Sequence, residues 1–134
     1  TPKNFIIILI ATISVSTVIL LNPFSENPDF SNFTFDAVYL KDSNSVSITF
    51  SDTNAKSSFA VLEILGMENT FHEEFEIYDS KFTKLVPLDK VPKYGWKTTP
   101  VTLEITYDES IVYMKTEIHN ENQISPVVIF GKSD

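Results

Sequence analysis

The sequence predicts an all-β protein: an antiparallel immunoglobulin-like or fibronectin-like β-sandwich preceded by one N-terminal transmembrane α-helix. Residues 5–21 carry no charge, as a membrane-spanning helix requires. Beyond residue 31, apolar and polar residues alternate in short stretches between turn residues, at the spacing of roughly 8 to 12 residues typical of a sandwich. No later stretch shows a sustained helical period. A closed barrel is the alternative arrangement of the same strands.

The N-terminal apolar run ends at Asn22-Pro23. A helix over residues 5–21 would measure about 25 Å, near the short limit for a bilayer core about 30 Å thick. A cleavable signal peptide is the alternative, but its apolar core is usually about 7 to 15 residues long. No small-residue cleavage site precedes Pro23. We therefore expect residues 1–22 to form an uncleaved membrane anchor.

Charges around the anchor predict its orientation. Lys3 precedes the apolar run, whereas Glu26 and Asp29 follow it, so the positive-inside rule places the N-terminus in the cytoplasm. Residues 23–30 contain two prolines and are expected to form a linker. Residues 31–134 would then form one extracytoplasmic domain of a single-pass protein in the cell membrane.

One side of the anchor carries small and hydroxyl side chains. Thr12 and Ser16 lie four residues apart, and Ala11 is adjacent. This spacing lets transmembrane helices approach closely and form hydrogen bonds across their contact. Such hydroxyls can also bond to carbonyls of their own helix. We take Ala11, Thr12 and Ser16 as candidate contacts with other integral membrane subunits within the lipid bilayer.

Eight strands are expected after the linker. They lie at residues 32–40, 46–50, 59–65, 71–78, 81–86, 101–107, 111–118 and 126–130. The first two alternate cleanly on either side of turn residues 41–44, which predicts a hairpin. The third follows a second turn, and its continuous apolar composition predicts a more completely buried strand.

The later strands follow from the same alternation. In the fourth, Phe75 and Ile77 point inward, and Asp79-Ser80 predicts a turn into the fifth. Residues 87–100 hold three of the seven prolines and form the longest irregular segment. The sixth and seventh strands flank the turn residues Asp108-Glu109 as another hairpin, and the eighth is short and follows a polar loop.

The amino-acid composition excludes several kinds of binding site and partner. The chain contains no Cys, which excludes a disulfide, a thiolate metal site and a lipoprotein thioether within it. Its net charge is −8, which argues against nucleic acid as a partner. Every basic residue is Lys, so guanidinium clamps on phosphate are excluded as well. Eleven Phe, five Tyr and one Trp supply a large aromatic part of the core.

The densest set of potential metal ligands is His72, Glu74 and Glu76, which would share one face of a strand. Neighbours on that face stand about 7 Å apart, so a metal could bridge two of them. We expect instead a solvated face paired with Lys81 and Lys84 across a hairpin. The chain has two His, three Gly and no Gly-x-Ser-x-Gly motif. It therefore predicts no catalytic residue, no cofactor, no metal and no small-molecule substrate.

The segment Val91–Pro100 is the candidate surface for a specific contact. It contains Tyr94 and Trp96, the one Trp of the chain, together with Lys side chains. This combination suits either a protein contact or the membrane interface, where aromatic rings lie at headgroup level. The alternative is that Trp96 folds back and closes one end of the sandwich.

The run Val86–Ile105, which enters a strand after a single N-terminal anchor, resembles small envelope proteins of ammonia-oxidising archaea. The absence of Cys, Lys in place of Arg and an acidic exterior fit this resemblance. Some single-pass proteins of those organisms are accessory subunits of the membrane ammonia monooxygenase. The resemblance therefore implies a supporting role beside copper-bearing subunits, and it assigns no functional residue to this chain.

Together these patterns predict a non-catalytic accessory subunit that binds larger membrane partners through its helix and its β-domain. One alternative is a subunit of a surface filament or envelope lattice, whose last strand adds to a neighbour's sheet. Another is a metal-dependent enzyme or metal carrier that uses His72 and the adjacent Glu side chains.

Overall fold

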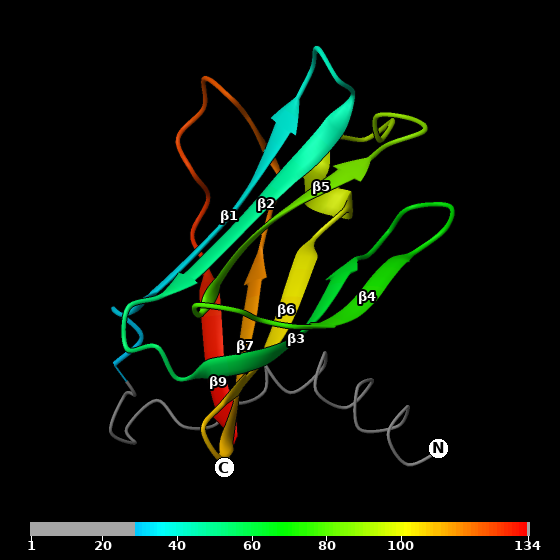
Figure 1. The fold of residues 1–134 in the computed structure, drawn as a ribbon. Coiled ribbons are helices and arrows are strands. Elements are labelled where there is room, and N and C mark those ends of the chain that lie inside the picture. Colours follow the sequence, from blue (N-terminus) through cyan, green and yellow to red (C-terminus); the bar gives the residue numbers. More distant parts are fainter. Residues whose placement is uncertain (1–28, 134) are drawn as a thin grey trace.

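The computed structural model describes residues 29–133 of the 134-residue chain, and the domain they form is almost entirely β-structure (Figure 1). In chain order the elements are β1 (Phe33–Leu40), β2 (Ser45–Asp52), β3 (Ser57–Ile64), β4 (Phe71–Glu76), β5 (Lys81–Pro87), the 3₁₀ helix η1 (Trp96–Thr98), β6 (Val101–Tyr107), β7 (Ser110–Thr116), β8 (His119–Asn120) and β9 (Ile129–Ser133). They form two sheets, with strand orders β5-β2-β1-β8 and β4-β3-β6-β7-β9. The two sheets share one apolar core, as in a β-sandwich, and do not close into a single barrel.

Two of the predicted hairpins are present. β1 and β2 pair antiparallel from Phe33↔Asp52 to Leu40↔Ser45, and β6 and β7 pair antiparallel along their lengths. Asn44 and Asp108 adopt positive φ in the two turns, a conformation that Asn and Asp tolerate better than other non-glycine residues. The turn residues seen in the sequence therefore place these hairpins correctly.

The fourth and fifth strands lie in different sheets, so the hairpin expected between them is not formed. β4 pairs with β3, whereas β5 pairs with β2. The chain changes sheets through Asp79 and Ser80, both at positive φ, and only an isolated bridge joins Tyr78 to Lys81. Alternation reports which face of a strand is buried and does not report its partner.

The last part of the chain differs from the predicted single strand. β8 adds two residues to the edge of β1, in parallel, so the sandwich is not wholly antiparallel. β9 begins at Ile129 and pairs with β7, whereas the sequence predicted a strand at residues 126–130. Pro126 has no N–H for a strand ladder, so it is a poor start for a paired strand.

The core is built from the inward faces of both sheets. Its most completely buried side chains include Ile48 and Phe50 from one sheet, and Leu62, Leu103 and Ile105 from the other. Since no Cys is present, this apolar packing and the strand ladders hold the described domain together.

The sandwich has a proximal end and a distal end, which carry different turns. The proximal end is where the described chain begins at Asp29, beside the turns at residues 53–56, 77–80 and 108–109. The distal end carries the turn at residues 41–44, the segment 88–100 and the turn at residues 120–123 (Figure 1). β1 runs from one end to the other, and its eight residues measure roughly 25 Å at about 3.3 Å each.

Candidate partner-binding surface at the distal end

The segment 88–100 is held at both ends by buried side chains. Leu88 is 6% exposed and Thr99 is 1% exposed. Gly95 adopts φ +86°, which favours glycine, and the turn of η1 follows directly. The Thr99 N–H donates to the Trp96 carbonyl oxygen at 3.1 Å, and the Thr98 hydroxyl donates to that of Gly95 at 2.9 Å. The loop therefore presents its exposed residues from a defined backbone.

Tyr94 and Trp96, both predicted as contact residues, lie in different environments. Tyr94 is 78% exposed. Trp96 is half-buried against the core, and its ring centroid lies 4.9 Å from that of Tyr39. The Trp96 indole N–H donates to the side-chain oxygen of Asn120 at 3.3 Å. Trp96 thus helps to close the distal end, while Tyr94 projects from it.

Two further apolar side chains are exposed in the part of the chain that lies beside the aromatic loop. Ile124 is 95% exposed and Val127 is 84% exposed, both in the segment between β8 and β9. A hollow of about 560 Å³ joins this segment to the aromatic loop, and its lining residues are Tyr94, Gly95, Trp96, Lys97, Glu117, Ile118, His119, Gln123, Ile124 and Pro126. Tyr94 and Ile124 line this hollow together, and exposed apolar side chains gathered at one place commonly mark a binding surface. We call Tyr94 and Ile124, with Val127 three residues beyond Ile124 in the chain, the distal apolar patch.

The sequence did not single out Ile124, and it placed Val127 only in the last predicted strand, which could add to a neighbour's sheet. Ile124 follows the polar run Asn120–Gln123, and that isolation was the one available signal. Its position beside Tyr94 depends on the parallel pairing of β8 with β1, which period-two alternation does not reveal.

His119 fixes the start of this segment to β1. The residue is 6% exposed; Nε2 lies 2.7 Å from Asp36 Oδ1, and Nδ1 lies 2.8 Å from the Asn120 carbonyl oxygen. Both neighbours are hydrogen-bond acceptors, and they hold the ring through its two nitrogens. Ser125 Oγ lies 3.4 Å from the same Nε2. In a catalytic triad Ser and Asp use opposite ring nitrogens, so this group positions the loop and is not a triad.

The loop carries a local positive charge in an acidic chain. Segment 88–100 contains Lys90, Lys93 and Lys97 but one acid, Asp89. Lys90 Nζ lies 3.8 Å from Glu68, and Lys93 Nζ lies 5.6 Å from the Tyr94 ring centroid. Lys93 lies over the Tyr94 ring, and Lys97 lines the hollow beside it together with Glu117. Two ammonium groups therefore lie next to the apolar patch, where they can meet carboxylates of a partner.

The acidic segment around His72 has different partners from those predicted. His72 contacts Glu63 and Glu74, each at 3.3 Å. Burial lowers the pKa of His72, but bonds and charge from these two carboxylates outweigh it and raise the pKa above its ordinary value. Burial, followed by repulsion from Glu63 and Glu74, raises the pKa of Glu104. These groups form an electrostatic cluster on the outer face of β3, β4 and β6.

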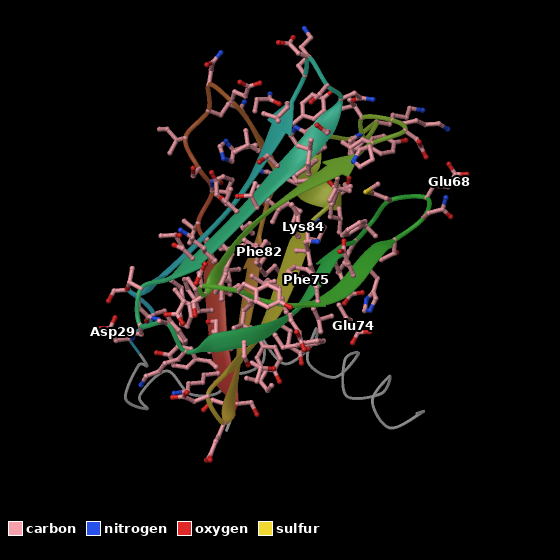
Figure 2. All side chains as sticks on the ribbon, in the orientation of Figure 1. Asp29, Glu68, Glu74, Phe75, Phe82 and Lys84 are labelled. Carbon is pink, nitrogen blue, oxygen red and sulfur yellow. The ribbon has the colours of Figure 1, made fainter. Side chains whose placement is uncertain are left out.

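Lys84 does not pair with this face. Its Nζ lies 2.8 Å from Glu73 and 4.3 Å from the Phe75 ring centroid. The rings of Phe75 and Phe82 meet edge to face at 5.0 Å (Figure 2). Lys84 therefore closes the gap between β4 and β5, and the expected pairing of Lys81 and Lys84 with the outer face is wrong.

A metal site and a membrane-spanning helix can be assessed for the described residues alone. Among residues 29–133, no group of three or more His, Asp or Glu side chains is arranged so that it could hold a metal ion. The same residues contain no helix long and apolar enough to cross a membrane. The predicted anchor, with Ala11, Thr12 and Ser16, lies outside the described residues and stays a prediction.

The chain was compared with protein families, curated proteins and solved structures. No family, no curated protein and no solved structure matched it.

Proposed function

We propose that this protein is a non-catalytic, membrane-anchored accessory subunit whose β-domain binds a larger membrane partner at its distal end. The observation that carries the proposal is the distal apolar patch of Tyr94, Ile124 and Val127. Exposed aromatic and aliphatic anchors rimmed by charged side chains are typical of protein contacts.

The arrangement of the strands supports a binding module of immunoglobulin-like topology. With β1, β2, β3, β4, β5, β6 and β7 named A, B, C, C′, E, F and G, the sheets read E-B-A and C′-C-F-G. β4 pairs with β3, as the C′ strand of variable domains pairs with strand C. β8 and β9 each extend one of the two sheets beyond these seven strands. In variable domains the binding loops include B–C and F–G, which correspond here to the proximal turns at residues 53–56 and 108–109. The choice of the distal end therefore rests on its exposed side chains and not on the topology.

The direction of the chain supports a protein contact over a lipid contact for Tyr94. The described chain begins at the proximal end. An anchor in residues 1–22 would place that end next to the bilayer and the distal end roughly 25 Å farther away. The distal apolar patch would then face partners that protrude from the membrane. The resemblance of residues 86–105 makes the subunits of an archaeal ammonia monooxygenase the first partners to test.

Copurification from the native membrane tests the proposal. The full chain is extracted in mild detergent after cross-linking, and the recovered proteins are compared for the wild type, Tyr94→Ser/Ile124→Ser and Leu85→Ser. Leu85, on β5, is 60% exposed and serves as a matched apolar control. We expect the double variant to lower partner recovery about tenfold or more, as for interface hot spots, with no change for Leu85→Ser. Migration of the wild-type chain as a lone monomer would contradict the proposal.

The helix contact is tested separately. Replacement of Thr12 and Ser16 by Leu removes the hydroxyls and adds bulk at the proposed helix contact. We expect the variant to insert into the membrane normally, since both changes raise hydrophobicity, but to recover less partner. Unchanged recovery of partner proteins would show that the helix is not part of the proposed interface.

A filament or lattice subunit is the second candidate, favoured by the position of β9. Among the described residues, β9 ends its sheet and pairs with β7 alone. An unpaired strand edge can accept a strand from another molecule. Filaments in electron micrographs that disappear when residues 126–134 are deleted would favour this function over the first.

A further inference from the structure

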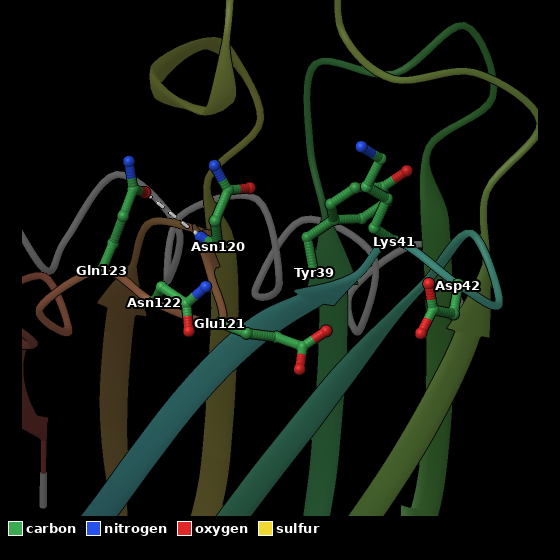
Figure 3. A pocket seen from close by; sticks show the side chains of 7 residues that line it. All are labelled: Tyr39, Lys41, Asp42, Asn120, Glu121, Asn122 and Gln123. Atoms are coloured by element: carbon green, nitrogen blue, oxygen red, sulfur yellow. Dashed lines mark hydrogen bonds between the residues drawn. The ribbon is translucent and has the colours of Figure 1, made fainter.

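We infer that the distal end also contains a saccharide-binding site, in the hollow between the β1–β2 turn and the turn after β8. The hollow measures about 590 Å³, and its lining residues are Tyr39, Lys41, Asp42, Asn120, Glu121, Asn122 and Gln123 (Figure 3). This volume lies within the range of small-ligand sites in proteins. Two turns far apart in sequence therefore converge on one cavity.

Three carboxamides supply most of the polar groups on one wall. Asn120 Oδ1 accepts the Trp96 indole N–H, and Gln123 Oε1 accepts the Asn120 backbone N–H at 3.2 Å. These bonds fix both side chains through their oxygens and leave the amide N–H groups available to a ligand. Asn122 has no side-chain hydrogen bond to any described residue. The wall thus offers oriented donors together with a free amide oxygen.

Two carboxylates add acceptors to the same hollow. Asp42 projects from the β1–β2 turn, and Glu121 projects from the turn that carries the amides (Figure 3). Neither carboxylate forms a hydrogen bond or an ion pair with another described residue. Acceptors and donors therefore approach the cavity from two sides. A hydroxyl group of a ligand can then donate a hydrogen bond to one side chain and accept one from another.

An aromatic wall completes the site. The Tyr39 ring lines the hollow and packs against Trp96 at 4.9 Å between centroids. Its hydroxyl donates to the side-chain oxygen of Asn44 at 2.8 Å, which fixes the ring. A rigid aromatic ring gives an apolar surface to the C–H groups of a sugar, while the amides and carboxylates bond its hydroxyls.

The composition of the hollow disfavours other ligand classes. A phosphate would meet one cation, Lys41, and two carboxylates. A metal ion would lack a ligand set, because the described residues provide no cluster of three suitable side chains. A purely apolar ligand would leave the amides without water or partners. A neutral ligand with many hydroxyls satisfies all of these groups.

The site can hold more than one sugar unit. Gln123 lines both this hollow and the neighbouring hollow that contains Tyr94 and Trp96. A short oligosaccharide would therefore extend past Gln123 toward a second aromatic platform. Because Asn122 and Asp42 lie outside the distal apolar patch, saccharide binding can be lost while a protein contact is kept.

A glycan array tests the inference. The fluorescently labelled full chain, in lipid nanodiscs, is applied to an array of neutral oligosaccharides that includes oligomers of glucose, mannose and N-acetylglucosamine. The variant Asn122→Ala/Asp42→Ala is compared with Asn69→Ala/Asp89→Ala. Both pairs are exposed, and the control pair lines a different hollow at the distal end. Neither variant removes a hydrogen bond between described side chains, so folding should be preserved.

We expect the wild type and the control variant to bind the same saccharides, and Asn122→Ala/Asp42→Ala to lose at least tenfold in affinity. Absence of binding to every oligosaccharide above empty nanodiscs would overturn the inference. Equal binding by all three proteins would also overturn it, since the saccharide would then occupy another site. Partner recovery by Asn122→Ala/Asp42→Ala should equal that of the wild type, which separates this result from a failure of the proposed function.

Discussion

The carboxylate of Asp52 joins the turns of the proximal end. Its side chain is buried and accepts hydrogen bonds from the Asn32 amide and the Ser57 hydroxyl, each at 2.8 Å. The backbone N–H groups of Asn54 and Lys56 donate to it as well, each at 2.9 Å. Burial acts to raise the pKa of Asp52, but the four hydrogen bonds together lower it below its ordinary value.

Asp52→Ala should therefore destabilise the domain by about 2–3 kcal/mol at pH 7, because it removes a buried acceptor from several donors. The contribution of a carboxyl with a lowered pKa is present above its unfolded pKa of about 3.9 and is lost as the pH falls through the folded pKa. Urea unfolding of the full chain in detergent, followed by Trp96 fluorescence, measures the difference. The difference in free energy of unfolding between the wild type and Asp52→Ala should shrink below about pH 4.

Asp42→Ala is the control for Asp52, since Asp42 is an exposed turn residue with no side-chain partner among the described residues. It should change the free energy of unfolding by less than about 0.5 kcal/mol. Equal losses for the two variants would show that the hydrogen bonds of Asp52 add nothing to stability.

The ionised side chain of Glu104 should destabilise the domain, whereas that of Asp52 stabilises it. Its pKa is raised by burial and by the charges of Glu63 and Glu74. A folded pKa above the unfolded pKa of about 4.3 means that stability falls as the pH rises between the two values. Glu104→Gln should therefore raise the free energy of unfolding by about 0.5 kcal/mol at pH 7, a size typical of partly screened charges.

Unfolding curves at pH 7 and pH 3.5 measure this effect, with Glu109→Gln at an exposed turn as the control. The gain for Glu104→Gln should disappear at the lower pH, where Glu104 is protonated in both states. A loss of stability at pH 7 would mean that the ionised carboxylate is favourable where it lies.

Two glycines show how the distal loops are joined. Gly66 and Gly95 both adopt positive φ, at +76° and +86°. A Cβ at Gly66 would overlap the carbonyl oxygen of Thr98, whereas a Cβ at Gly95 would meet open space. The β3–β4 turn therefore rests directly on the backbone of the loop that presents Tyr94.

Gly66→Ala should thus cost about 2 kcal/mol more than Gly95→Ala, because both introduce backbone strain but only the first forces two loops apart. Urea unfolding followed by Trp96 fluorescence provides the comparison. The Gly66 variant should also weaken partner recovery, since it displaces the loop next to the distal apolar patch. Equal losses of stability would show that the two loops separate without cost.

Hairpins of two consecutive strands could be predicted from the sequence. Alternation at Phe33, Phe35 and Ala37, with a turn before Ser45, was sufficient to place β1 and β2. The partner of β4 could not be predicted, because Phe75 and Phe82 alternate equally well with strands of either sheet. Their contact across the gap between sheets depends on the crossing at Asp79 and Ser80.

The candidate site could be predicted only in part, for the same reason. Tyr94 stood out because a Pro-rich loop with aromatic and Lys residues is unusual on an acidic domain. Ile124, Asn120 and Gln123 join it through the two-residue pairing of β8 with β1 and the buried contact of His119 with Asp36. Neither interaction leaves a periodic pattern in the sequence.

At the scale of the whole molecule, the two ends have separate tasks in the proposed function. The proximal end leads toward the predicted anchor and is held by a polar network around Asp52. The distal end carries the exposed apolar patch, the Lys side chains and the amide-lined hollow. Binding variants should therefore come from the distal end and stability variants from the core and the proximal turns.

Site-specific photo-cross-linking in the native membrane tests whether the distal end binds a membrane partner. A benzophenone amino acid replaces Tyr94 in one sample and Thr49, an exposed residue in the middle of β2, in another. We predict a discrete adduct with an integral membrane protein from position 94 and none from position 49. The absence of an adduct at position 94, or the same adducts from both positions, would contradict the claim that the distal end binds a membrane partner.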